Sequence, residues 1–174
     1  MLFRSAVADD TLRPAVEADL ESLLVLNNAA VPAVNALDAA EMAWFAEVAH
    51  LFLVADSPKG PVGFLIGLEG PDLSYRSLNY QWFASNYGLF LYVDRVVVDP
   101  EWWGRGLGRA FYRALVVSAG DHPVLCAEVN LVPRNDRSLA FHQRFGVSPV
   151  GEQRSGEHTS ELPSHLNLVC RLLL

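Results

Sequence analysis

The stretch that decides the fold reads Val96-Val97-Val98-Asp99-Pro100-Glu101-Trp102-Trp103-Gly104-Arg105-Gly106-Leu107-Gly108-Arg109. Its three valines are β-branched and predict the last residues of a strand, which Asp99 and Pro100 terminate. Three glycines at alternate positions predict a tight turn, and apolar residues at helical spacing follow from Gly108 onward. The stretch therefore predicts a strand, a glycine-rich turn and a helix in direct succession.

This glycine-rich turn has features of a phosphate-binding loop. The first N–H groups of a helix have no intrahelical acceptor and lie at the positive end of its dipole, so they attract a pyrophosphate. Glycines let such a ligand approach the backbone, and Arg105 and Arg109 add positive charge. The spacing differs from the Gly-x-Gly-x-x-Gly pattern of dinucleotide-binding proteins. Because tight turns also use glycine for conformation alone, the turn by itself leaves both interpretations open.

The rest of the chain alternates between predicted strands and predicted helices. Apolar periodicity and turn residues predict strands at 12–15, 51–55, 62–68, 89–98, 124–129 and 147–153. They predict helices at 17–28, 37–50, 108–119 and 138–145. This interleaving indicates an α/β or mixed α+β fold with a central sheet. The aromatic and polar stretch 70–87 either lines a functional site or packs onto the core as a lid or short helix.

Length, charge and composition narrow the class of protein. A chain of 174 residues fits one domain, and its net charge of −7 disfavours a nucleic-acid partner. The two cysteines form no disulfide framework, and Cys126 lies in an apolar run typical of a core. The five histidines show no spacing typical of a metal site. Neither a signal peptide nor a membrane-spanning segment is expected, so we expect a cytoplasmic protein without a membrane partner.

Two segments resemble motifs of the GNAT acetyltransferases. The glycine-rich turn resembles the family's Arg/Gln-x-x-Gly-x-Gly/Ala motif, with Gly106 and Gly108 at its glycine positions. Trp103 stands where the family usually has Arg or Gln, so the side-chain contribution there differs. Downstream, residues 135–147 resemble the family segment Asn-x-x-(Ala/Ser)-x-x-Phe-Tyr-x-x-x-Gly-Phe. Two motifs in this order and at this distance make the resemblance specific.

The resemblance covers the chain from about residue 12 to residue 153. Within it, residues 128–130 resemble the end of the family's fifth strand, and residues 94–100 are similar to an uncharacterised bacterial branch. It implies a mostly antiparallel, twisted central sheet with flanking helices. It also implies acetyl-CoA as the co-substrate and no metal.

The resemblance further implies which residues hold the cofactor. The pantetheine arm would bond to the backbone of Val96, Val97 and Val98 like an added strand. The pyrophosphate would lie on the residues of the glycine-rich turn, namely Gly104, Arg105, Gly106, Leu107, Gly108 and Arg109. Asn135 would reach the pantetheine or the phosphates. Its position before Ser138 equally suits a helix N-cap, and the two roles are compatible.

The implied reaction moves an acetyl group to a primary amine of a small molecule or peptide by direct attack in a ternary complex. A base must first take a proton from the ammonium group. Glu128 is the first candidate and Asp94 the reserve, although Glu128 could instead fix a neighbouring loop. His142 stands where the family has a tyrosine that protonates the departing thiolate. A packing role for His142, with water as the acid, is the other interpretation.

A second interpretation of the whole chain is a non-catalytic acyl-CoA-binding domain. The replacement of the family's tyrosine by His142 favours it, and so does the unusual C-terminal part of the chain. The sequence leaves the acceptor and the oligomeric state open.

The C-terminal segment resembles a translated sequencing-library adaptor rather than a protein. The similarity covers residues 154–164 and 168–174, with Gly156 and Pro163 as departures. We therefore expect a GNAT domain at residues 1–153 and a non-native tail at 154–174. The final strand of the sheet is then expected to be missing or replaced by the tail, whose apolar end at 166–174 can pair as a strand.

Overall fold

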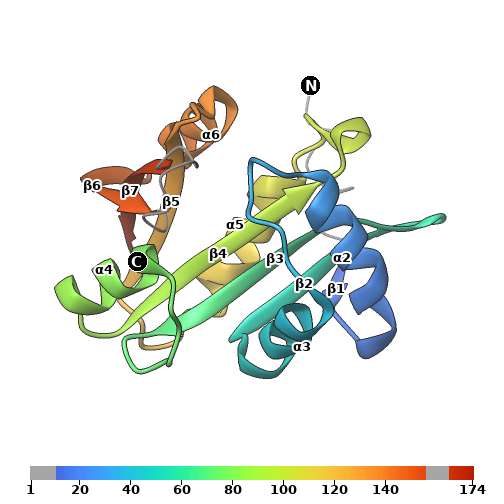
Figure 1. Ribbon diagram of the computed structural model, residues 1–174, viewed down its shortest axis with the longest axis horizontal. Helices are drawn as coiled ribbons and strands as arrows, with labels where there is room; N and C mark the ends of the chain where they lie inside the picture. The colour runs from blue at the N-terminus through green and yellow to red at the C-terminus, as the bar shows by residue number, and fades with distance from the viewer. Residues whose placement is uncertain (1–10, 156–164) are drawn as a thin grey trace, which may run out of the picture. The chain divides into compact units, whose positions relative to one another are not determined.

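The structure is a computed structural model that describes residues 11–155 and 165–174 (Figure 1). Its seven strands are hydrogen-bonded in the order β1-β2-β3-β4-β5-β7-β6, and five α-helices, α2 to α6, occur in the described residues. The β4–β5 pairing is parallel, whereas the β1–β2, β2–β3, β5–β7 and β6–β7 pairings are antiparallel. This arrangement confirms the predicted mixed fold with a mostly antiparallel sheet. The chain divides into an N-terminal unit, Met1–Leu68 with Asp94–Ser118, and a C-terminal unit, Glu69–Val93 with Ala119–Leu174.

The N-terminal unit is built on strands β1 (Leu12–Pro14), β2 (Leu51–Ser57) and most of β3 (Gly60–Gly70). Every residue of β3 from 62 to 68 is buried, because helices cover both of its faces. Helix α5 (Leu107–Val117) packs closely against one face. A Cβ atom at Gly67 would lie 2.7 Å from Cδ1 of Leu115, so this close approach requires glycine.

The other face of β2 and β3 carries the helices α2 (Leu20–Ala29) and α3 (Ala39–Val48) (Figure 1). The predicted helix at 17–28 is divided into a short 3-10 turn, η1 (Glu17–Asp19), and α2. Helix α3 begins after Asp38, whose carboxylate accepts a hydrogen bond from the Glu41 amide at 2.8 Å. Such an N-cap satisfies an amide that the helix itself leaves unpaired.

The C-terminal unit contains α4 (Leu78–Asn86), β5 (Val124–Val132), α6 (Asp136–Phe145), β6 (Ser148–Ser155) and the first residues of β4 (Phe90–Val98). Leu91–Val93 of β4 pair in parallel with Leu125–Ala127 of β5. Helix α4 lies within the aromatic stretch 70–87, where Tyr80 and Phe83 are 1% and 0% exposed. For these two side chains, the structure supports the second interpretation of the stretch, in which a short helix packs onto the core.

The C-terminal segment that resembles an adaptor supplies strand β7 (His165–Leu173). It lies between β5 and β6, pairing antiparallel with both, and Val169 is fully buried. The expected domain boundary at residue 153 falls inside β6. Residues 156–164 of the expected tail, including His158, lie outside the described residues, as do the first ten residues. No helix among the described residues is both long enough and apolar enough to span a bilayer.

Candidate active site

The glycine-rich turn has the backbone geometry that its sequence predicts. After β4 ends at Val98, a 3-10 turn η2 (Pro100–Trp102) follows. Gly104 and Gly106 have φ angles of 75° and 87°, which non-glycine residues rarely adopt. Apart from the adjoining residues of the chain, no heavy atom of the described residues lies within 4 Å of a Cβ atom placed on either glycine. Glycine is therefore needed at both positions for conformation, and the space beside this backbone is open to a ligand.

Helix α5 begins directly after this turn without a side-chain cap. Gly106 is its N-cap and has no side chain that can accept from the first amides. The first intrahelical bond runs from the Ala110 amide to the Gly106 carbonyl at 3.0 Å. The amides of residues 107–109 precede it, so they have no acceptor one turn earlier in the helix. With the positive end of the helix dipole, they form a cradle suited to an anion.

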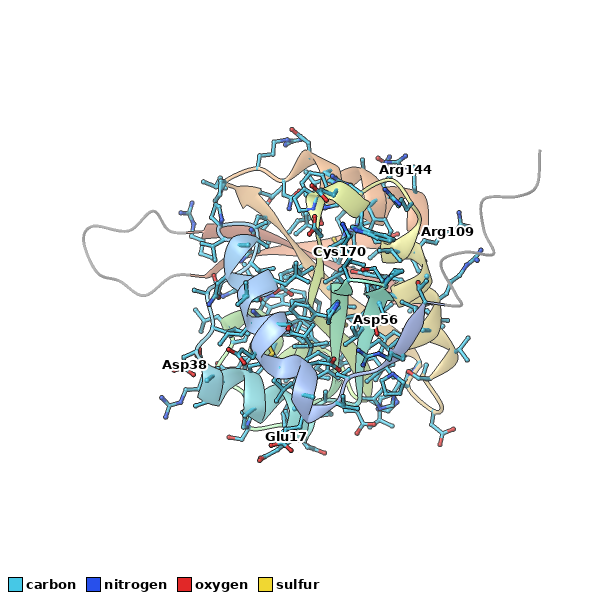
Figure 2. The ribbon with its side chains drawn as sticks, turned by 90° about the vertical axis from the view of Figure 1, so that its right-hand side faces the viewer. Glu17, Asp38, Asp56, Arg109, Arg144 and Cys170 are labelled. Carbon is cyan, nitrogen blue, oxygen red and sulfur yellow. The ribbon has the colours of Figure 1, made fainter. Side chains whose placement is uncertain are left out.

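The two arginines of the turn differ in their surroundings. The guanidinium of Arg105 lies 4.5 Å from the ring centroid of Trp102, a cation–π contact that holds this side chain on η2. Arg109 is exposed and projects outward from the first turn of α5 (Figure 2). Leu107 is buried and anchors the start of the helix.

The end of strand β4 carries a contact that sequence reasoning missed. The indole Nε1 of Trp103 donates a hydrogen bond to the carbonyl of Val98 at 2.8 Å. Trp103 therefore folds back onto the strand. Val97 is buried in the core, whereas the side chains of Val96 and Val98 are half-buried. The only sequence signal for the Trp103 contact is the indole N–H, which acts as a donor and never as an acceptor.

Asp94, the reserve base, belongs to a buried ion pair. Its Oδ2 lies 2.8 Å from Nε of Arg95, and the side chains are 3% and 7% exposed. Nη1 of Arg95 also donates to Oδ1 of Asn27 at 2.9 Å and to the Asn35 carbonyl at 3.2 Å. This network gives Asp94 a structural partner, which makes it a poor choice for accepting a proton from a substrate.

Glu128, the first candidate base, is half-buried on β5 and receives a hydrogen bond from Tyr92 of β4. The Tyr92 hydroxyl donates to Oε1 of Glu128 at 2.8 Å. Sequence reasoning missed Tyr92, because the two residues are 36 positions apart and meet only through the parallel register of β4 and β5. A phenol O–H that donates to a carboxylate favours its ionised form.

Asn135 and His142 lie at the two ends of helix α6. Oδ1 of Asn135 accepts from the Ser138 amide at 3.0 Å, which is the predicted N-cap. Nδ1 of His142 lies 2.8 Å from the Ser138 carbonyl, so this nitrogen carries a proton. Burial lowers the pKa of His142 below its ordinary value, and the bond to Ser138 offsets this only in part. The imidazole is therefore neutral at neutral pH.

The cysteines do not contribute a nucleophile. Cys126 is fully buried, as predicted from its apolar surroundings, and burial raises the pKa of its thiol to about 12. Cys170 lies in the interior (Figure 2), where burial raises the pKa of its thiol to about 11. Across residues 11–155 and 165–174, no three His, Cys, Asp or Glu side chains gather as a metal site.

Comparison with known families and structures gives one consistent result. The model of the family described as "Acetyltransferase (GNAT) family" matches residues 20–147. None of the curated proteins gives a significant sequence match.

Several solved structures have a similar fold at low sequence identity. The ribosomal-protein-S18-alanine N-acetyltransferase of Escherichia coli is 17% identical over 94% of this chain and 92% of its own, with a TM-score of 0.68. Naa20 of Chaetomium thermophilum, in complex with a bisubstrate analogue, is 21% identical over 94% and 86%, with a TM-score of 0.73. The putative acetyltransferase yncA of Salmonella typhimurium, with its cofactor acetyl-CoA, is 20% identical over 94% and 92%, with a TM-score of 0.67.

Proposed function

Because the chain belongs to the GNAT family of acetyltransferases, we propose that it transfers an acetyl group from acetyl-CoA to a primary amine of a small molecule or peptide. The observation that carries the proposal is the uncapped start of α5 after two open glycines with positive φ. The family match supports the cofactor, and the solved structure of yncA holds acetyl-CoA in a similar fold.

The residues of the N-terminal unit fit the cofactor. The amides of residues 107–109 suit a pyrophosphate, and a Cβ atom on Gly104 or Gly106 would meet none of the described residues beyond its chain neighbours. The backbone at Val96–Val98 would bond to the pantetheine arm as an added strand does. The Val98 carbonyl already accepts from Trp103, so this arm would rely chiefly on the backbone groups of Val96 and Val97. In the C-terminal unit, Asn135 is the N-cap of α6 and is the remaining residue that the family resemblance implies for the cofactor.

The reaction needs one base and one proton for the leaving group. Glu128 takes a proton from the ammonium group of the acceptor, either directly or through water. The neutral amine then forms a bond to the thioester carbon, the carbon–sulfur bond breaks, and the thiolate leaves with the electron pair. The nitrogen gives up its second proton to become an amide, which balances the proton that the thiolate takes up to become a thiol. Acetyl-CoA supplies the activated acyl group for this direct attack in a ternary complex.

His142 is the candidate donor of the proton that the departing thiolate takes up. The proton on Nδ1 is donated to the Ser138 carbonyl, so a neutral His142 has none on Nε2 to give to a thiolate. A general acid at this position would have to be the doubly protonated imidazole, which the lowered pKa makes scarce at neutral pH. These observations favour the packing role for His142 and water as the acid.

Two measurements test the proposal against its alternative, an acyl-CoA-binding domain without catalysis. Acetyl-CoA should raise the melting temperature, whereas NAD and ATP at equal concentration should not. Thiol release from acetyl-CoA should then depend on a pool of amines that includes peptides, because one similar structure is that of a ribosomal-protein-S18-alanine N-acetyltransferase. Stabilisation without thiol release would support the binding domain, and the absence of both would contradict the proposal.

Substitution of the base sharpens this test. Glu128→Gln should lower kcat by about 100-fold, the contribution typical of a general base, and leave the affinity for acetyl-CoA unchanged. A variant with undiminished activity would remove Glu128 from this role.

A further inference from the structure

Tyr92 and Glu128 lie on the same face of two neighbouring parallel strands. Tyr92 is paired with Cys126, which precedes Glu128 by two residues on β5. Residues two apart on a strand point to the same side, so the Tyr92 and Glu128 side chains are directed to one face. The hydroxyl donates to Oε1 at 2.8 Å, and the Tyr92 side chain is fully buried. This contact is therefore a hydrogen bond from a buried tyrosine to the proposed base.

The ring of Tyr92 is fixed by side chains that α4 contributes. The ring centroids of Tyr80 and Phe83 lie 5.5 Å and 5.8 Å from that of Tyr92. Tyr80 is fixed in turn, since its hydroxyl donates to the Glu69 carbonyl at 2.8 Å and accepts from the Leu73 amide at 3.2 Å. The Tyr80 ring meets the Tyr92 ring edge-to-face and the Phe83 ring is tilted against it, and such packing from two sides restricts the position of the Tyr92 ring. The hydroxyl of Tyr92 is thus aimed before any substrate arrives.

Four other residues near Glu128 on β5 and β7 differ from Tyr92 in what they offer the carboxylate, namely Val169, Cys126, Cys170 and Arg171. Val169 stands opposite it on β7 and offers no side-chain donor. Burial, and after it the Glu128 carboxylate, raises the pKa of the thiols of Cys126 and Cys170, so both thiols stay neutral. The guanidinium of Arg171, which faces Cys126, lies 5.8 Å from the ring centroid of Tyr87. Tyr92, by contrast, places its hydroxyl 2.8 Å from Oε1 of this carboxylate and donates a hydrogen bond to it.

We propose that Tyr92 is a positioning residue for the base: its hydroxyl holds Oε1 of Glu128, which fixes the position of the carboxylate and favours its ionised form. The inference rests on the proposed function, because it assigns to Glu128 the task of accepting the proton. Helix α4 then has a catalytic consequence without touching the reacting atoms, since its aromatic side chains hold the ring that orients the base. The aromatic residues of this stretch therefore affect the rate of acetyl transfer through the position of Glu128.

The decisive experiment is a double-mutant cycle on acetyl transfer. Tyr92→Phe removes one oxygen and keeps the ring, and it should lower kcat by about ten-fold while the KM for acetyl-CoA stays unchanged. Glu128→Gln alone should lower kcat far more than Tyr92→Phe does. Adding Tyr92→Phe to Glu128→Gln should lower kcat no further, because the effect of Tyr92 passes through Glu128. Tyr112→Phe is the matched control, because it removes a phenol hydroxyl from a buried tyrosine of the N-terminal unit and should retain kcat.

A pH profile gives a readout that a purely structural role of Tyr92 would not change. Without the donor the ionised carboxylate is less favoured, so the acidic limb of kcat/KM should move to higher pH in Tyr92→Phe. The neutral thiols of Cys126 and Cys170 and the guanidinium of Arg171 are the same in both proteins, so they do not cause this shift. Glu128→Asp is a second variant that does not depend on Tyr92→Phe being folded. It withdraws the carboxylate from the hydroxyl and should also lower kcat.

The outcomes separate this inference from the proposed function. Turnover by the wild type with an unchanged kcat in Tyr92→Phe would overturn the positioning role and leave the acetyltransferase intact. Equal losses from Tyr92→Phe in the wild-type and Glu128→Gln backgrounds would overturn it as well, because they show independent effects. A wild-type protein that releases no thiol with any amine would overturn both.

Discussion

At the scale of single residues, the account depends on the protonation states of two side chains on neighbouring elements of the C-terminal unit. Glu128 accepts a hydrogen bond from Tyr92 and is available as a base only while it is ionised. His142 is buried and bonded through Nδ1 to the Ser138 carbonyl, which suits a neutral imidazole. The ring therefore contributes packing at the C-terminal half of α6, and its charge state links stability to pH.

The lowered pKa of the buried His142 gives the first prediction. Its folded pKa lies below the ordinary value of about 6.5, so below that pH the unfolded chain binds more protons than the folded one. The free energy of unfolding should therefore fall as the pH drops from about 6.5 towards the lowered pKa. The free energy of unfolding of His142→Phe should fall less steeply over this pH range, and this variant should keep most of the wild-type kcat. Urea unfolding at several pH values measures this, and parallel curves for the two proteins would contradict the burial of a neutral ring.

At the scale of elements, the loop between α2 and α3 is tied to β4 through one buried arginine. Arg95 contacts Asn27 at the end of α2 and the Asn35 carbonyl in the loop, and its guanidinium lies 5.0 Å from the ring centroid of Phe45 on α3. Its pairing with Asp94 keeps a buried carboxylate compensated. Arginine suits this position because its planar fork can serve several acceptors at once.

Removal of this arginine gives the second prediction. Arg95→Ala should lower the free energy of unfolding by about 3 kcal/mol, because it leaves the Asp94 charge buried without its partner. The double variant Arg95→Met with Asp94→Asn is the control, since it removes both charges and should recover much of the loss. Chemical denaturation measures both, and a single variant as stable as the wild type would contradict the buried network.

Elements with strong local signals were predictable from the sequence, and those without them were not. Pro100 and the glycines mark the end of β4 and the start of α5, so the predicted helix 108–119 differs from the observed Leu107–Val117 by one or two residues. Helix α4 begins with a cap at Ser77, but its apolar residues form no clear helical stripe, and its fixation depends on Tyr80 and Phe83 contacting Phe90 of β4. The contact between Tyr92 and Glu128 requires the parallel register, which no local pattern encodes.

At the scale of the whole molecule, the strand that lies between β5 and β6 comes from the segment that resembles an adaptor. Strand β7 has the apolar residues that a central strand needs, including the buried Val169 and Cys170. An unpaired edge accepts a strand of suitable pattern whatever its origin, so this pairing does not depend on the segment being native. We propose that residues 154–174 are a non-native tail. Sequencing of the source DNA across this junction tests that, and a continuous natural gene would contradict it.

Deletion of residues 156–174 gives the third prediction. Strands β5 and β6 would lose their shared neighbour and expose the apolar face that it covers, so the C-terminal unit should no longer unfold cooperatively. Hydrogen exchange should then be fast in β5 and β6 and remain slow in β2 and β3. Val169→Ala is a milder control that keeps the strand and should retain protection in β5. Unchanged exchange in the deleted protein would mean that β7 contributes nothing to the sheet.

The measurement that tests the central claim most directly is a comparison of acetyl-CoA with S-acetylpantetheine, which lacks the diphosphate, in binding to the wild type and to Gly106→Ala. The cradle at the start of α5 predicts that the wild type binds acetyl-CoA at least about ten-fold more tightly. A side chain at Gly106, where φ is 87°, costs about 1 kcal/mol or more, so the variant should lose most of that preference. Gly88→Ala is the matched control, because Gly88 has open space and no positive φ. Equal affinity of the wild type for both ligands, or a preference that Gly106→Ala leaves intact, would contradict the claim.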